Sequence, residues 1–241
     1  MSARPLGSLV LLPNRIAQAS PETSLPAGTL EVAHRLRHFR VESAKSARAF
    51  LKAIGHPVPL AQLDIQEIGH APAAERIAEW LSPLAAGDDV AVVSESGCPG
   101  VADPGASLVA AAHALGARVR PLVGPSSILL ALMASGLEGQ RFRFVGYVPV
   151  DADRQASALR TLERESARGE TQIFIETPYR NRKLFDALLA QCAPRTRLAV
   201  AVDLTGPGEF VAMRRIAEWR TRPASEAPPF ERTPAVFCLL A

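Results

Sequence analysis

The segment of residues 94–105 (SESGCPGVADPG) has the residue types best suited to hold a small ligand. Its twelve residues include three glycines, two prolines and two carboxylates, Glu95 and Asp103. Glycines let a backbone approach a ligand closely, and prolines stiffen a loop. The segment follows an apolar run, residues 89–93, that predicts a buried strand. Because ligands bind beyond the carboxyl ends of strands in open α/β sheets, the loop predicts a nucleoside or amino-acid site, although such turns also join strands to helices in loops without a site.

The other strand-end loops carry fewer chemical groups. The candidates for a general base or an orienting group are Glu42, Lys45, Glu95 and Asp103. Asp103 precedes a Pro-Gly pair, where capping a turn or the following helix is the commoner role of an aspartate. Nucleotide-binding glycine motifs, the P-loop and the nucleophile-elbow pattern are all absent from the sequence, which disfavours ordinary dinucleotide, P-loop and hydrolase chemistry.

The composition is that of a globular protein and excludes disorder. Of the 241 residues, 48% are hydrophobic and 21% are charged, and no apolar run reaches the about 18 residues that a membrane span needs. The three cysteines and five histidines show no metal-ligand spacing, so no metal site is predicted. Widely separated cysteines and the lack of a signal-like start predict a reduced, cytoplasmic protein.

Basic residues gather in one stretch of the first half of the chain. The net charge is only +3, so composition alone does not indicate a nucleic-acid-binding protein. The cluster itself fits either an anion-binding surface or a solvated helix face. The residues predicted to contact a polyanionic substrate are Arg15, Arg37, Arg40, Lys45 and Arg48.

Strand-like and helix-like segments alternate, which predicts an α/β architecture with mostly parallel pairing and antiparallel pairs late in the chain. The predicted strands are residues 9–12, 39–41, 89–93, 117–122, 142–145, 171–175, 198–202 and 235–240. The predicted helices are residues 29–37, 43–54, 73–86, 107–115, 126–135, 153–168 and 180–192. The expected domain boundary divides the chain into residues 1–121 and 122–241.

Three stretches resemble one protein family. They are VAVVSESGCPGVADPG, PLVGPSSILLALMASGLEGQRFRFVGYVP and TQIFIETPYR. Together they resemble the tetrapyrrole methylase superfamily of S-adenosylmethionine-dependent methyltransferases, and within it the branch that methylates the 2′-oxygen of ribose in small-subunit ribosomal RNA. The likeness extends over nearly the whole chain and is most specific over residues 90–149.

The resemblance implies a fold, a cofactor and a set of contacts. It implies two α/β domains with S-adenosylmethionine in a cleft between them, in a homodimer. The residues that it implies as cofactor contacts are Ser96, Gly97, Cys98, Val101, Ser126, Ser127, Glu176, Leu204 and Thr205. RNA is the expected substrate, and no membrane partner is expected.

The loops expected to face the substrate depart from the family. The first loop of the family reads P-T-P-I-G-N, but here residues 13–18 read PNRIAQ, with Arg15 in place of a proline. Two other family motifs also lose a charged residue, at Ser43 and at Gly206. The sequence therefore leaves two alternatives open, namely a methyltransferase for a tetrapyrrole or another small molecule, and a cofactor-binding homologue without activity. Arg15 is expected either to recognise a substrate anion or to pair with Glu95 or Asp103.

Overall fold

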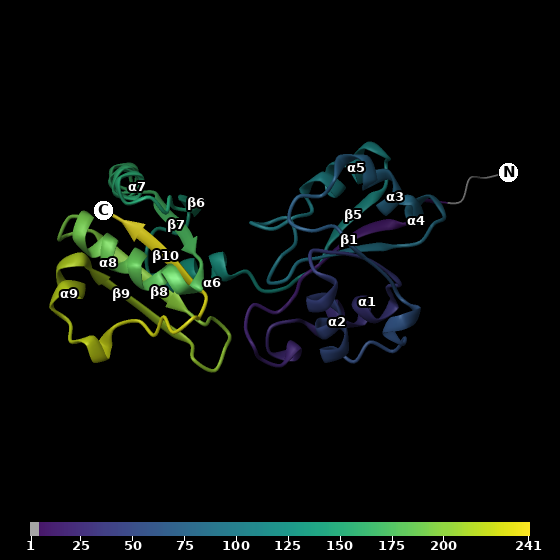
Figure 1. Cartoon of the computed structure of the whole chain (residues 1–241), viewed down its shortest axis with the longest axis horizontal. Helices are drawn as coiled ribbons and strands as arrows, with labels where there is room; N and C mark the ends of the chain where they lie inside the picture. Colours follow the sequence, from purple (N-terminus) through teal and green to yellow (C-terminus); the bar gives the residue numbers. More distant parts are fainter. Residues whose placement is uncertain (1–4) are drawn as a thin grey trace. The chain divides into compact units, whose positions relative to one another are not determined.

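The chain forms two compact units, Met1–Ser126 and Ser127–Ala241, each built on its own five-stranded sheet. The structure is a computed structural model and describes residues 5–241 (Figure 1). Helices flank both sheets, so the predicted α/β class is confirmed. No helix between residues 5 and 241 is both long and apolar enough to cross a bilayer.

The first unit, unit 1, has a wholly parallel sheet in the order β3-β2-β4-β1-β5. Its strands are β1 (Ser8–Leu12), β2 (His38–Val41), β3 (Asp64–Glu67), β4 (Val90–Val93) and β5 (Arg118–Pro121). Its α-helices are α1 (Ala27–Arg35), α2 (Ala44–Ala53), α3 (Ile77–Trp80), α4 (Ser82–Ala85) and α5 (Ala106–Ala114), and its 3₁₀ turns are Pro21–Thr23, Leu60–Gln62 and Ala74–Arg76.

Alternating side chains of the unit 1 strands divide the core between the two faces of the sheet. Val10 of β1 packs in one cluster with Phe50 of α2, whereas the next residue back, Leu9, packs in another with Trp80 and Leu108. Helices α1 and α2 therefore cover one face and α3 to α5 cover the other (Figure 1). Because both faces are covered, β4 is buried along its whole length, as is typical of a parallel sheet.

The second unit, unit 2, has a mixed sheet in the order β6-β7-β10-β8-β9. Strands β6 and β7 are parallel, and β10 runs antiparallel to both of its neighbours. Its strands are β6 (Phe142–Tyr147), β7 (Thr171–Glu176), β8 (Arg197–Val202), β9 (Phe210–Arg215) and β10 (Ala235–Leu240). Its α-helices are α6 (Ser127–Ser135), α7 (Ala152–Ser166), α8 (Asn181–Gln191) and α9 (Ile216–Thr221), and its 3₁₀ turns are Pro178–Arg180 and Ala224–Glu226.

The predicted helix over residues 73–86 is wrong as a single element. It is divided into a 3₁₀ turn, Ala74–Arg76, and the short helices α3 and α4. Pro83 has no backbone N–H to donate to the carbonyl of Glu79, and the hydroxyl of Ser82 donates to that carbonyl instead, at 2.8 Å. Strands β3 and β9 were not predicted, because the polar DIQE of β3 and the FVAMRR of β9 lack a clear apolar alternation.

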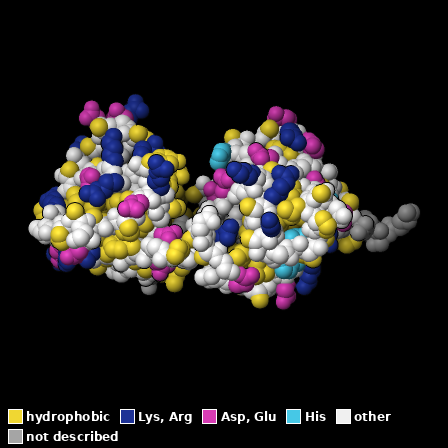
Figure 2. All heavy atoms as spheres, turned by 60° about the horizontal axis from the view of Figure 1, so that its bottom comes forward, with side chains coloured by type: hydrophobic (Ala, Val, Ile, Leu, Met, Phe, Trp, Pro, Cys, Tyr) yellow, Lys and Arg dark blue, Asp and Glu magenta, His cyan; other side chains and the backbone are white. Residues whose placement is uncertain are grey.

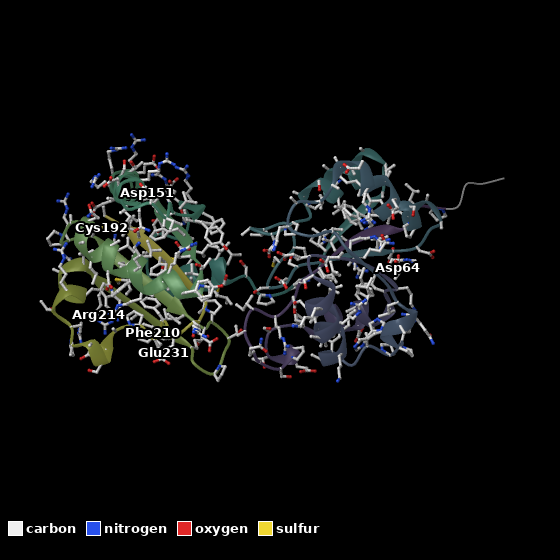
Figure 3. The ribbon with its side chains drawn as sticks, in the orientation of Figure 1. Asp64, Asp151, Cys192, Phe210, Arg214 and Glu231 are labelled. Atoms are coloured by element: carbon white, nitrogen blue, oxygen red, sulfur yellow. The ribbon has the colours of Figure 1, made fainter. Side chains whose placement is uncertain are left out.

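Arg40 does not lie on the surface, so its predicted role in binding a phosphate is wrong. Its side chain is 1% exposed in the middle of β2. The guanidinium donates from Nε to the carbonyl of Trp80 at 2.7 Å and from Nη1 to Oδ2 of Asp64 at 3.0 Å. Asp64 is labelled in Figure 3. A buried guanidinium requires such partners, and Arg40 therefore ties the first residue of β3 to β2.

The carboxylate of Asp64 joins three donors. His38 donates to Asp64 at 2.9 Å and Gln66 donates to it at 3.0 Å, in addition to Arg40. Burial by itself raises the pKa of the Asp64 carboxyl. The hydrogen bonds from His38, Gln66 and Arg40 outweigh burial and hold that pKa below its usual value.

Replacing Asp64 with asparagine should therefore weaken the acid dependence of stability. A carboxyl whose pKa is lower in the folded state stabilises that state above its unfolded pKa, and the stabilisation is lost as the pH falls through the folded pKa. At neutral pH we expect Asp64→Asn to lose about 1 kcal/mol, because the side chain is partly exposed. Urea unfolding at several pH values measures this. The exposed pair of Arg76 and Glu79 provides the control, and a Glu79→Gln variant that loses as much would contradict the assignment.

Candidate functional site

Two strand-end loops of unit 1, those after β1 and β4, are joined by Asn14. This residue follows β1 and is 3% exposed. Its amide Nδ2 donates to the carbonyls of Ser94 and Glu95, at 3.1 and 3.0 Å, while its backbone N–H donates to the carbonyl of Gly97 at 2.9 Å. A single residue, Asn14, therefore fixes the start of the loop that follows β4. No local pattern in the sequence predicts this role for Asn14.

The loops after β4 and β5 also contact each other. The thiol of Cys98 donates to the carbonyl of Pro125 at 3.3 Å. A Cβ on Gly97 would lie 3.3 Å from Cγ2 of Ile16 and 3.5 Å from the same Pro125 oxygen, and Gly97 has a φ of +67°. Gly97 is thus favoured by its left-handed backbone conformation and by the close approach of Ile16, whereas the sequence suggested only a close approach of a ligand. Burial raises the pKa of the Cys98 thiol, which opposes a nucleophilic role.

The remaining predicted contacts of unit 1 lie on the same loops. Val101 is 48% exposed and is followed by Ala102, whose φ of +62° is in the left-handed region. Ser126 is half-buried directly after Pro125 and ends unit 1. The buried hydroxyl of Ser94 lies near the carboxyl of Asp103 and lowers the pKa of that carboxyl, although burial outweighs this effect. A small ligand with polar and apolar parts suits this combination of exposed valine and loop backbone.

Three of the four predicted acid–base candidates lie around the ends of β2 and β4. Glu42 follows β2 and is 7% exposed. Its Oε2 accepts the backbone N–H of Glu95 at 3.0 Å, and its Oε1 lies 2.6 Å from Nδ1 of His70. Burial and the charges of Glu42 and Glu95 raise the pKa of Asp103 to about 6. These carboxylates are therefore close enough to influence one another, as in many sites that handle protons.

Asp103 does not cap the helix that follows it. The residue before α5 is Gly105, and no side chain accepts a hydrogen bond from the first turn of α5. Of the two capping roles expected for Asp103, the helix cap is therefore wrong, and Asp103 belongs to the group of carboxylates near Glu42.

Arg15 pairs with neither of the acids named in the sequence analysis. Its Nη1 donates to the carbonyl of Ala19 at 2.9 Å, within its own loop. The side chain is half-buried, and the pairing expected with Glu95 or Asp103 does not form in the structure. The alternative in which Arg15 recognises an anionic substrate stays a prediction.

The basic cluster is divided between the two ends of β2. Arg37 precedes β2, and its Nη1 donates to the carbonyl of Leu36, at the end of α1, at 3.0 Å. Lys45 and Arg48 follow β2 on α2, three residues apart and both exposed. On the face in Figure 2, Lys and Arg side chains alternate with acidic and apolar ones. Of the predicted contacts in this cluster, only Lys45 and Arg48 follow the carboxyl end of a strand, where ligands bind.

In unit 2 the predicted residues lie at one edge of the sheet. Glu176 ends β7, and Leu204 and Thr205 follow β8. Both strands flank β10, whose Ala235 pairs with Glu176 on one side and Val202 on the other. Ser127, the first residue of α6, is half-buried.

Local constraints hold both of these unit 2 loops. The buried Oε1 of Glu176 accepts hydrogen bonds from the backbone of Thr177 at 2.6 Å and from Arg180 at 2.7 Å. Asp203 and Thr205 have φ values of +49° and +66°. Left-handed residues other than glycine carry strain that the surroundings must offset, and such residues gather at functional sites.

Unit 2 also has a pocket of about 600 Å³ beside the end of β7. Tyr179, which is 78% exposed, lines it together with Arg182, Phe230 and Arg232. An exposed aromatic ring flanked by guanidinium groups can stack on a nucleic-acid base while cations contact phosphate. Tyr179 was not predicted to bind a ligand, although it lies in the motif TQIFIETPYR. The signal that could have identified it is an aromatic residue just after the end of a strand.

Together, the two units define an α/β protein whose polar strand-end loops could hold a small ligand. The model of the tetrapyrrole (corrin/porphyrin) methylases matches residues 24–219. The chain therefore belongs to the tetrapyrrole methylase family, which confirms the family predicted from the sequence.

Curated relatives share one name. The chain is 33% identical over 186 residues to "Ribosomal RNA small subunit methyltransferase I" of Xylella fastidiosa, covering 77% of this chain and 65% of the relative. The protein of that name from Bacillus subtilis is 29% identical over 213 residues, covering 88% and 69%. The one from Pseudomonas aeruginosa is 34% identical over 148 residues, covering 61% and 51%. The chain thus spans about half to two thirds of the length of these relatives.

Solved structures share the fold over nearly the whole chain. The methyltransferase CobJ aligns with a TM-score of 0.59 at 20% identity, covering 98% of this chain and 94% of that one. A uroporphyrin-III-C-methyltransferase from Thermus thermophilus aligns with a TM-score of 0.55 at 22% identity, covering 97% and 94%. At these identities the likeness establishes the fold alone.

Removal of the Asn14 amide should loosen the loops that it joins. Asn14→Ala leaves two carbonyls without their donor, and we expect a loss of about 2–3 kcal/mol in the unfolding free energy. Gln18→Ala removes an exposed amide from the same loop and should cost less than about 0.5 kcal/mol. Denaturant unfolding compares the two variants, and equal losses would contradict the role given to Asn14.

Proposed function

We propose that the protein is an S-adenosylmethionine-dependent methyltransferase that acts on RNA, with the 2′-oxygen of a ribose in ribosomal RNA as the acceptor. The observation that carries the proposal is the family membership together with the joined strand-end loops of unit 1, where Asn14 links the loops after β1 and β4 and Cys98 links the loops after β4 and β5. The name shared by the curated relatives supports ribosomal RNA as the substrate.

The residues proposed to hold the cofactor are those implied by the resemblance. In unit 1 they lie on the loop after β4 and beside Pro125, where exposed Val101 supplies an apolar contact. In unit 2 they are Ser127, which begins α6, and Glu176, Leu204 and Thr205, which lie at one edge of the sheet. When bound, the cofactor supplies a methyl group on a positively charged sulfur, and the protein's principal task is to orient the acceptor oxygen.

RNA is favoured over a small acceptor by the cations after β2 and by the unit 2 pocket. Lys45 and Arg48 follow β2 at the carboxyl ends of the strands, and Tyr179 lines a pocket together with Arg182 and Arg232. We also propose a cytoplasmic homodimer. The exposed Leu129 and Met133 on α6, at 50% and 78% exposure, support the dimer, because a second copy would cover their apolar surface.

Cofactor binding can be tested at Val101. We expect S-adenosylmethionine to bind the isolated protein, and we expect Val101→Asn to weaken the binding about five- to tenfold through loss of an apolar contact. Val150 provides a matched control, because it is equally exposed, at 50%, and follows β6. Calorimetry measures both variants. The placement of the cofactor is wrong if Val150→Asn weakens binding as much as Val101→Asn does.

RNA as the acceptor can be tested by methyl transfer and by salt dependence. We expect radiolabelled methyl groups to enter ribosomal RNA from cells lacking the gene, and not porphyrins. Lys45→Ala with Arg48→Ala should lower the slope of log affinity against log salt by about 1.4 if both contact a single strand. The double variant of Arg35 and Arg37 removes the same charge at the other end of β2 and should leave the slope unchanged.

Three outcomes would contradict these expectations. If both double variants have the same slope of log affinity against log salt, the basic residues attract RNA by their summed charge and not through specific contacts of Lys45 and Arg48. Transfer to a porphyrin but not to RNA would establish the small-molecule alternative, and cofactor binding without any transfer would establish the inactive homologue.

A further inference from the structure

Glu42 and His70 form a pair of a buried acid and an exposed imidazole at the carboxyl edge of the unit 1 sheet. Oε1 of Glu42 lies 2.6 Å from Nδ1 of His70, with side-chain exposures of 6% and 83%. The other carboxylate oxygen accepts the backbone N–H of Glu95 at 3.0 Å. The acid is thus fixed from two sides while the ring faces solvent.

The order of the strands places this pair beside the proposed cofactor loop. His70 follows β3, Glu42 follows β2 and Glu95 follows β4, and these three strands are neighbours in the order β3-β2-β4. Two strand spacings amount to about 10 Å, so an acceptor held over the end of β2 could reach both the ring and the loop at 96–101. Glu42 connects the two directly through its two oxygens.

The charge on Glu42 decides which ring nitrogen of His70 is free. At 2.6 Å a lone pair on Nδ1 would face the lone pairs of the carboxylate oxygen, so we place the proton on Nδ1. Nε2 then keeps its lone pair and is exposed to solvent. This is the arrangement by which a buried acid orients a histidine as a general base.

We propose that His70 is the general base that takes the proton of the acceptor hydroxyl, and that Glu42 is the positioning residue that fixes its tautomer. The proposal rests on the proposed function, because it requires an acceptor with an O–H group. Neither the family match nor the resemblance assigns a role to His70.

The step balances with the groups named. The proton of the hydroxyl passes to Nε2 of His70 as the acceptor oxygen bonds to the methyl carbon. The electron pair of the broken carbon–sulfur bond stays on sulfur, which loses its positive charge. His70 becomes a cation beside the carboxylate of Glu42, with Glu95 and Asp103 nearby, so the positive charge moves toward a group of acids.

His38 offers a matched control for His70, because it lies on β2, the strand that Glu42 follows. Its Nδ1 lies 2.9 Å from Oδ2 of Asp64, so it also pairs a histidine with an acid, in this case through a hydrogen bond. His38 begins β2, however, and therefore lies at the opposite edge of the sheet from Glu42 and His70. If only the ion pair mattered, replacing either histidine would slow methyl transfer equally. If His70 transfers the proton, only its replacement slows methyl transfer.

Single-turnover methyl transfer to RNA at saturating cofactor tests the base. We expect His70→Gln to slow transfer by about 100-fold or more, with the cofactor and RNA affinities of the parent. His70→Ala should recover part of its rate when imidazole is added. His38→Gln should transfer at the rate of the parent, with thermal unfolding measured for each variant. A His70→Gln rate equal to that of the parent, or an equal loss in His38→Gln, would overturn the proposal.

Histidine nitrogen NMR tests the tautomer without cofactor or RNA. We expect His70 to carry its proton on Nδ1 in the parent. Glu42→Gln keeps an oxygen for the N–H of Glu95 but turns an amide donor toward Nδ1, so the proton should move to Nε2. An Nε2–H tautomer in the parent, or no change in Glu42→Gln, would refute the positioning role. A parent that transfers no methyl group to RNA would refute the proposed function instead, since the tautomer is measured independently.

Discussion

The loops of unit 1 depend on the amide of one buried side chain, that of Asn14. Two donors on Nδ2 serve two successive carbonyls of the loop after β4, and the backbone N–H of the same residue serves a third, that of Gly97. Asn14 Oδ1 in turn accepts the backbone N–H of Arg15 at 2.8 Å. Buried polar groups are costly unless they are paired, so these loops can adopt this arrangement only as a set.

The same edge of the sheet gathers acids that repel one another. Glu42 is buried, and the pKa of Asp103 is raised to about 6 by burial and by the charges of Glu42 and Glu95. Natural proteins keep such like charges together only where neighbouring groups compensate for them. Here the compensation comes from the N–H of Glu95 and from the ring of His70. The loop that Asn14 fixes therefore supplies one of the donors that stabilise the carboxylate of Glu42.

Sequence patterns predicted the elements with strong local signals. Ser43 caps α2 by accepting the N–H of Ser46, and Gly116 and Gly136 adopt positive φ values where the helices were expected to end. The family motifs predicted the two α/β sheets. Local signals failed where tertiary contacts decide: Arg40 looked like a surface cation, yet its partners Trp80 and Asp64 are 40 and 24 residues away in the sequence. The pairing of Glu42 with His70 was missed for the same reason.

The direction of the strands distinguishes two histidine–acid pairs of unit 1 that have the same residue types. His38 with Asp64 and His70 with Glu42 are similar pairs, but only the second lies where the parallel strands of unit 1 end. In unit 2 the ends of β7 and β8 lie beside the first residues of β10, because β10 is antiparallel to both strands. The start of a strand therefore also contributes to this edge.

The residues before β10 consequently join the two predicted contact loops of unit 2. The carbonyl of Thr233 accepts from Nδ2 of Asn181 at 2.8 Å, and the carbonyl of Pro234 accepts the N–H of Asp203 at 3.1 Å. The lead-in to β10 thus ties the start of α8, just after Glu176 and its 3₁₀ turn, to the loop that contains Thr205. A substitution that weakens these bonds would disturb both predicted contact loops of unit 2 at once, although neither bond involves a predicted contact residue.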